Sequence, residues 1–447
     1  MWRRLRYISW FISAFFAKHK NALFLGGLAS FLVFLFAWRY SQAALQVIFR
    51  QKQVIGIVGQ YTPATLPRSV QEKISVGLTQ VSVAGDVIPA AAESWEIRDS
   101  GKTYIFKMKK NILWHSGEEF KATDVNYGFR DADISPINAE ILRITLNEPF
   151  SPLPSLLSKP LFKDGLQGLG PHRVSRIKFE GQYISEIRLE PLNTDLDHPE
   201  IIKFYPTLSQ AVTAFKLGQI DTLETLEGSN DLLDWEDYIS VSKEPNYGQF
   251  VAILFNTDHA PFNEKQFRQA LAYSISDEIT GGQIKSPIPD KYWAYNTALK
   301  KISFNEGKAL ELLGAGALAS ESASTSFTIH TFTDLLDTAH QLSEDWKLLG
   351  LESNIKLVNT VPEDFDVFLT ILEIPVDPDQ YSLWHSIQNN TNLTRYENPK
   401  IDKLLEDGRK TVNLPERKEI YDELQRYLMD ELPAIFLFHP TKYTFER

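Results

Sequence analysis

Residues 92–129, AESWEIRDSGKTYIFKMKKNILWHSGEEFKATDVNYGF, contain the clearest secondary-structure pattern in this 447-residue chain. Large apolar side chains alternate with other residues on both sides of the turn 99–101: Trp95, Ile97, Tyr104, Phe106 and Met108. A period of two around a Gly-containing turn predicts a half-buried β-hairpin. Beyond it, strand-like and helix-like stretches mix without repeats, which favours an α/β fold.

Two later stretches predict helices. Asn263 is a good N-cap, followed by Gln266 at the third helical position, and Phe262 and Phe267 have the spacing of a hydrophobic staple. A helix is therefore expected to start at Asn263. Near the C-terminus, Pro415 opens a second helical pattern. Pro433 ends this pattern before the apolar run 434–438, AIFLF, which we interpret as a buried strand.

Charge is distributed unevenly along the chain. The first 50 residues hold seven of the 46 basic residues and none of the 57 acidic ones, so residues 51–447 carry a net charge of −18. Such an acidic body lacks the basic face that nucleic acid requires. Cysteine is absent, which excludes disulfides and thiolate chemistry. The nine His are scattered, with no H-E-x-x-H motif, so neither a metal nor a cofactor is expected.

Residues 22–38, ALFLGGLASFLVFLFAW, contain no charged residue and predict a transmembrane helix. Five basic residues precede this stretch and two follow it within the first 50 residues. The positive-inside rule then places the N-terminus in the cytoplasm and the body outside the cell. A cleaved signal peptide is the alternative, because Ser41-Gln42-Ala43 has the small residues of a cleavage site.

Three blocks, in the same order along the chain, resemble the family 5 extracellular solute-binding proteins, the oligopeptide, dipeptide and nickel receptors of ABC importers. They are residues 92–129, residues 255–275 (FNTDHAPFNEKQFRQALAYSI) and residues 396–438, which begin YENPKIDKLLEDGRK. The resemblance implies an α/β fold of the type II periplasmic-binding class, with two lobes of mixed sheets joined by two crossover strands. It places residues 51–248 and 434–447 in lobe I and residues 249–433 in lobe II. The apolar stretch makes residues 1–50 a basic N-terminus and anchor before these lobes.

The resemblance also places one segment, residues 377–385, at the ligand cleft. Aromatic walls and a few polar atoms are what a binding cleft needs. We therefore predict ligand contacts from six residues, the last two of them by position at the cleft rim and the hinge: Asp377, Tyr381, Trp384, His385, Tyr61 and Tyr247. The alternative for residues 377–385 is a loop and helix start, with Asp379 as a cap and Trp384 in the core of lobe II.

Peptide receptors of this family have an Asp that pairs with the peptide ammonium, and the corresponding position here is Ile374. Either the ligand has no buried ammonium, or another carboxylate takes this role, and of Glu373 and Asp377 we expect Asp377 to be the substitute. The favoured solute is therefore neutral or amine-blocked.

The sequence shows no catalytic residues, so we expect a monomeric receptor rather than an enzyme. Its partners would be a small solute or peptide and an ABC permease in the membrane. Two alternatives stay open. One is an anchored sensor or envelope protein that uses the same clamp without transport. The other, less favoured, is an anchored hydrolase, which would need a nucleophile with a base.

Overall fold

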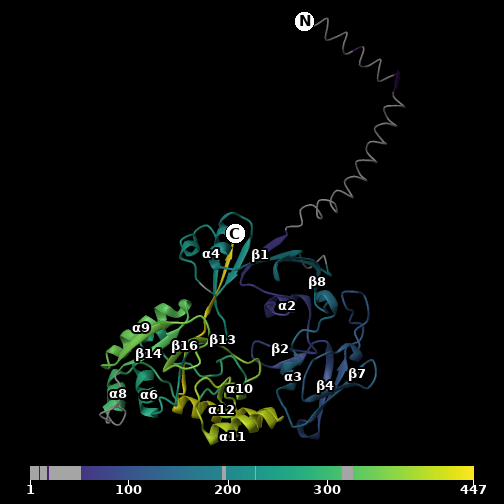
Figure 1. The fold of residues 1–447 in the computed structure, drawn as a ribbon. Coiled ribbons are helices and arrows are strands. Elements are labelled where there is room, and N and C mark those ends of the chain that lie inside the picture. The colour runs from purple at the N-terminus through teal and green to yellow at the C-terminus, as the bar shows by residue number, and fades with distance from the viewer. Residues whose placement is uncertain (1–9, 11–17, 20–51, 194–197, 227, 315–325) are drawn as a thin grey trace, which may run out of the picture.

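The computed structural model describes residues 10, 18–19, 52–193, 198–226, 228–314 and 326–447. Within these residues the chain folds into a mixed α/β structure with two main bodies (Figure 1). We call the body with the seven-stranded and four-stranded sheets lobe I, and the body with the five-stranded sheet lobe II. The predicted α/β class with mixed sheets is confirmed.

Lobe I contains the largest sheet, with strand order β12-β18-β11-β1-β10-β9-β8. Its strands are β1 (Gln53–Val58), β8 (His172–Glu180), β9 (Tyr183–Pro191), β10 (Glu200–Tyr205), β11 (Thr222–Thr225), β12 (Ser240–Pro245) and β18 (Thr441–Glu446). The helices along this lobe are α2 (Arg68–Ile74), α3 (Leu153–Leu156), α4 (Leu208–Lys216) and α5 (Asn230–Leu233), with short 3-10 turns η1 (Asp99–Gly101), η2 (Ala122–Asp124) and η3 (Asp164–Leu166).

The predicted hairpin is present and forms half of a four-stranded sheet, β4-β5-β7-β6. The strands are β4 (Ala92–Arg98), β5 (Thr103–Met108), β6 (Ala132–Pro136) and β7 (Ile141–Leu146), and a two-stranded ribbon lies beside them, β2 (Thr79–Val81) and β3 (Val87–Pro89). Trp95 lies opposite Phe106, and their rings stack at 6.0 Å. Tyr104 and Phe106 are fully buried, because one face of this sheet packs on the core of lobe I.

Lobe II is built on a five-stranded sheet, β15-β14-β16-β13-β17, with helices on both faces. Its strands are β13 (Gln249–Phe255), β14 (Ser326–Thr331), β15 (Glu352–Leu357), β16 (Val367–Glu373) and β17 (Ala434–Phe438). Its helices are α6 (Lys265–Tyr273), α7 (Asp277–Thr280), α8 (Glu306–Leu312), α9 (Leu336–Lys347), α10 (Tyr381–Trp384), α11 (Pro399–Lys410) and α12 (Leu414–Glu431), with η5 (Thr333–Leu335) before α9. Strand β13 is buried on both faces, since Ile253 joins the core that contains α6 and α9 while Phe250 joins the one that contains α11 and α12.

The chain crosses between the lobes twice, at residues 246–248 and at residues 439–440, and we call these the crossing segments. They lie side by side: the Asn246 backbone N–H donates to the Pro440 carbonyl at 2.8 Å. The second crossing comes five residues later than the boundary at residue 434 that the sequence indicates. The reason is that β17, the predicted buried strand, pairs with β13 and forms the edge of the five-stranded sheet.

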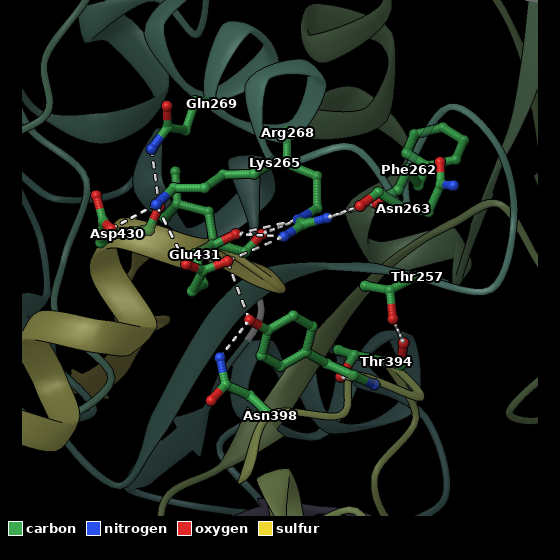
Figure 2. A network of polar contacts seen from close by, with 12 residues as sticks. Thr257, Phe262, Asn263, Lys265, Arg268, Gln269, Thr394, Asn398, Asp430 and Glu431 are labelled. Atoms are coloured by element: carbon green, nitrogen blue, oxygen red, sulfur yellow. Dashed lines mark hydrogen bonds and ion pairs between the residues drawn. The ribbon is translucent and has the colours of Figure 1, made fainter. Parts of the chain in front are cut away.

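The predicted start of the helix at Asn263 is wrong. Helix α6 begins at Lys265 after the N-cap Glu264, and no side chain caps it. The cause is the buried guanidinium of Arg268, which donates to the carbonyls of Phe262 and Asn263 at 2.7 and 3.1 Å (Figure 2). These carbonyls therefore turn toward Arg268 before the helix starts. The predicted contact between Phe262 and Phe267 is nevertheless present, with ring centroids 5.4 Å apart.

The predicted transmembrane helix at residues 22–38 lies outside the described residues. Among the residues that the structure does describe, none of the helices has the length and apolar character needed to cross a bilayer.

Candidate ligand-binding site

A pocket of about 460 Å³ lies against both crossing segments, and we call it the hinge pocket. Its volume is in the range of small-molecule sites in proteins. One wall comes from the crossing segments and the ends of their strands, namely Pro245, Tyr247, Phe250, Phe438 and His439. The other wall comes from residues 278–301 of lobe II and from Met429. The pocket therefore lies where a change in the angle between the lobes would alter its shape.

Aromatic rings line the crossing side of the hinge pocket. The imidazole of His439 lies 4.1 Å from the ring of Phe250, in a stacked arrangement, and 4.8 Å from the ring of Tyr247. The ammonium of Lys291 lies 4.1 Å from the centre of the Tyr247 ring, which is the geometry of a cation–π contact. The Tyr247 ring therefore contacts both a cation and an imidazole.

The protonation state of His439 follows from its surroundings. Its Nδ1 lies 2.8 Å from the Gln249 carbonyl, and because a carbonyl only accepts, Nδ1 carries the hydrogen. Burial lowers the pKa of His439, although the bond to Gln249 opposes this shift. The imidazole is therefore neutral near pH 7, and its Nε2 carries a lone pair. His439 offers a hydrogen-bond acceptor in the wall of the pocket.

Charged side chains occur at the exposed parts of the hinge pocket. Glu278 and Asp290 supply carboxylates, and Lys300 and Lys301 supply ammonium groups. All four residues are exposed. Ser286 is buried, but its hydroxyl donates to Gln425 at 2.8 Å. Apart from Lys285, which is partly buried, the enclosed part of the pocket is thus mainly aromatic and aliphatic, with charge near solvent.

The Asp377 carboxylate, which the sequence predicts to contact the ligand, is already bound within the protein. It is buried, and both of its carboxylate oxygens accept bonds from the guanidinium of Arg417, which is also buried. Burial alone lowers the pKa of Arg417, but the adjacent carboxylate outweighs burial and raises it, so the guanidinium stays charged. Arg417 also donates to the Gly408 carbonyl at 2.8 Å and to the Tyr421 hydroxyl at 2.9 Å. The carboxylate is therefore neutralised within lobe II.

The three aromatic residues after Asp377 pack inside lobe II. Trp384 is 2% exposed, donates from Nε1 to the Gln380 side chain at 2.8 Å and contacts the core, as the alternative interpretation states. The ring of His385 stands 4.1 Å from that of Tyr381, and its Nε2 is 3.5 Å from Glu406. Tyr381 is partly exposed, and the guanidinium of Arg409 lies 3.9 Å from the centre of its ring.

Tyr61 lies apart from both groups, in lobe I. It bridges to Ile184, its hydroxyl donates to the Val58 carbonyl at 3.0 Å, and its ring contacts Phe204 edge-on. Burial raises the pKa of its hydroxyl. The six predicted residues are thus found at three places: Tyr61 in lobe I, Tyr247 in the hinge pocket, and the other four around α10.

Sequence reasoning missed His439 and Arg417. For Arg417 a signal was present, since residues 417, 421, 424 and 428 share one face of α12, and the other three are Tyr421, Leu424 and Leu428. An Arg on such an apolar face needs a buried partner. His439 gave no such signal, because only the pairing of β17 with β13 brings it to the pocket. The described residues contain no group of three or more potential metal ligands.

The fold and the hinge pocket together define a two-lobed binding protein. A model of the bacterial extracellular solute-binding proteins, family 5 Middle, matches residues 86–133 and 201–393, which is more than half of the chain. The chain belongs to this family of bacterial extracellular solute-binding proteins, which consists of binding proteins rather than enzymes.

Individual relatives are distant but matched over most of their length. Di/tripeptide-binding protein 1 of Pseudomonas aeruginosa is 25% identical over 86% of each chain. Heme-binding protein A of Haemophilus influenzae is 24% identical over 79% of each chain. Among solved structures, NikZ from Campylobacter jejuni in complex with Ni(L-His) has a TM-score of 0.72 at 21% identity, covering 89% of this chain and 94% of that one. The oligopeptide-binding protein AppA from Bacillus subtilis, in complex with a nonapeptide, has a TM-score of 0.67 at 20% identity, covering 89% and 94%.

Proposed function

We propose that this protein captures a small solute in the hinge pocket, closes its two lobes about the crossing segments in response and delivers the solute to an ABC importer, without performing chemistry on it. The single observation that carries the proposal is the position of the pocket against both crossing segments. A solute held there has a different affinity for the open and the closed arrangement, and that difference is what shifts the equilibrium toward closure. An importer permease would recognise the closed arrangement.

We assign residues 51–248 together with β18 to lobe I, and residues 249–438 to lobe II. The pairing of β17 with β13 supports placing β17 in lobe II. The single-pass anchor with its N-terminus in the cytoplasm is also part of the proposal, and it rests on five basic residues before the apolar stretch against two after it. Protection of residues 51–447 from external protease in intact cells would contradict that topology.

The relatives bind chemically different ligands, so the pocket itself has to indicate the class of solute. Aromatic rings and the acceptor of neutral His439 suit a compact solute with a planar or apolar part and a hydrogen-bond donor. No buried carboxylate of the described residues lines the pocket, because Glu278 and Asp290 are both exposed. The favoured solute is therefore one without an ammonium group, either a neutral molecule or an amine-blocked one.

This class of solute leads to a prediction about peptide amines. Because an exposed ion pair contributes at most about 1 kcal/mol, acetylating the amine of a dipeptide should change its affinity by less than about fivefold. The measurement is a calorimetric titration of the full chain with Ala-Phe and with N-acetyl-Ala-Phe.

The control variants locate the binding site. Tyr247→Ala should weaken both peptides by roughly tenfold through loss of the aromatic wall, whereas Tyr238→Ala, which removes a tyrosine that is 85% exposed and outside the hinge pocket, should weaken neither. A hundredfold loss on acetylation would show that a buried carboxylate holds the amine. Unchanged binding by Tyr247→Ala would remove the hinge pocket from the proposal.

A further inference from the structure

The lobes touch at a second place, away from the crossing segments. In Figure 1, α3 of lobe I lies beside α10 of lobe II. Two serines of lobe I make the polar contacts here. The Ser155 hydroxyl donates to the Asp377 carboxylate at 3.0 Å, and Ser151 donates to the end of α11.

The Asp377 carboxylate is held in position to accept the hydrogen bond from Ser155. Arg417 holds both carboxylate oxygens, and the backbone N–H of Asp379 donates to one of them at 2.9 Å, so the carboxylate is fixed from within lobe II. A hydroxyl that donates to an ionised carboxylate makes a stronger bond than one between neutral groups. Because Arg417 already neutralises Asp377, withdrawing Ser155 leaves no buried charge unpaired. The contact can therefore form and break at modest cost.

Ser151 donates hydrogen bonds to carbonyls at the C-terminal end of α11. The last carbonyls of a helix have no partner within it, and at the end of α11 these include Gly408 and Arg409. The Ser151 backbone N–H donates to the Arg409 carbonyl at 2.8 Å, and its hydroxyl lies 3.1 and 3.0 Å from the carbonyls of Gly408 and Arg409. The guanidinium of Arg409 lies 5.2 Å from the ring of Phe150 and forms an ion pair with Asp379 at 2.8 Å.

We infer that Ser151 and Ser155 form a closure latch, in which Asp377, Arg417 and the end of α11 are the receiving side. These are positioning residues: they set the ratio of closed to open protein and do not contact the solute. The inference rests on the proposed clamp function, which it deepens by assigning Asp377 to closure rather than to the ligand. Since apparent affinity is proportional to the closed fraction, a weakened latch lowers the affinity for every solute by the same factor.

The test uses a matched pair of serines. Ser155→Ala removes the single side-chain bond of Ser155 shown by the structure, which crosses between the lobes. Ser158→Ala, three residues away and equally buried, removes bonds to the Ser155 carbonyl and to Arg68, both inside lobe I. The full chain contains no Cys, so Glu119→Cys in lobe I and Glu344→Cys in lobe II give unique sites for spin labels at exposed positions. The readout is the distance distribution between the labels, measured with no solute added.

We expect Ser155→Ala to move the closed-to-open ratio toward the open, longer distance by on the order of tenfold. Ser151→Ala should shift it in the same direction, and it provides the test if Ser155→Ala does not fold. Ser158→Ala should lower the unfolding midpoint without changing the distances. Unchanged distances in both latch variants, or an equal shift in Ser158→Ala, would overturn the latch. Because no solute is involved, this failure is distinct from that of the proposed function, which fails if no solute binds the wild-type chain.

Discussion

Asp377→Asn is expected to lower the free energy of unfolding of this protein by about 3–5 kcal/mol, the cost of breaking a buried ion pair from one side. Arg417 is 5% exposed, and its charge has no other carboxylate within ion-pair distance among the described residues. An amide in place of the carboxylate leaves that guanidinium buried without a counter-charge. The measurement is urea unfolding of the full chain, followed by tryptophan fluorescence.

Two variants show whether the charge is the cause. Asp407→Asn makes the same change in an exposed pair with Lys403 on α11, where we expect a loss below about 0.5 kcal/mol. The double variant Asp377→Leu with Arg417→Met removes both charges and should recover much of the lost stability. A loss below about 1 kcal/mol in Asp377→Asn, together with a large loss of solute affinity, would instead return Asp377 to the ligand site.

Arg268→Met should be comparably destabilising, by about 3–5 kcal/mol, for a different reason. Arg268 is 1% exposed, and its guanidinium donates to the backbone carbonyls of Glu431 and Leu432 at the end of α12 as well as to those of Phe262 and Asn263 (Figure 2). Methionine keeps the apolar stem but leaves these carbonyls without their donor, and each unsatisfied buried group costs about 1–3 kcal/mol. The same urea unfolding experiment measures the loss.

Lys265 provides the control for Arg268. It belongs to the same helix and reaches the same end of α12, through Asp430 at 2.5 Å and Glu431 at 3.2 Å, but its side chain is 33% exposed. Lys265→Met should therefore cost about 1 kcal/mol or less. Equal losses in the free energy of unfolding for Arg268→Met and Lys265→Met would contradict this expectation. They would mean that water hydrogen-bonds to the carbonyls at the end of α12 when the guanidinium is removed.

The parts of the fold that the sequence predicted are those set by local pattern. The hairpin of β4 and β5, the helix opened by Pro415 and the buried strand at residues 434–438 each follow from periodicity and from Gly or Pro at their ends. The start of α6 was predicted wrongly because Arg268 donates to the Phe262 carbonyl, which turns toward the guanidinium before the helix begins. A contact made by a residue inside the helix cannot be read from the cap motif before it.

The candidate site was harder to predict, because its chemistry depends on partners distant in sequence. Asp377 looked free, since its neighbours Val376 and Pro378 carry no charge and Arg417 lies 40 residues further along. The family resemblance placed Trp384 at the cleft, whereas its Nε1 donates to the side chain of Gln380 one helical turn earlier. Tyr247 is the predicted residue that the structure places in the hinge pocket, where it meets His439 from the other crossing segment.

The central claim is that a solute closes the two lobes, and the distance between labels at Glu119→Cys and Glu344→Cys tests it most directly. The solute is the small molecule that co-purifies with the full chain in mild detergent, identified by mass spectrometry, removed by partial unfolding and then added back. We predict that saturation with this molecule depletes the longer distance and leaves a single shorter one, as expected when a ligand favours one of two states. A distance distribution that is the same with and without saturating solute would contradict the claim.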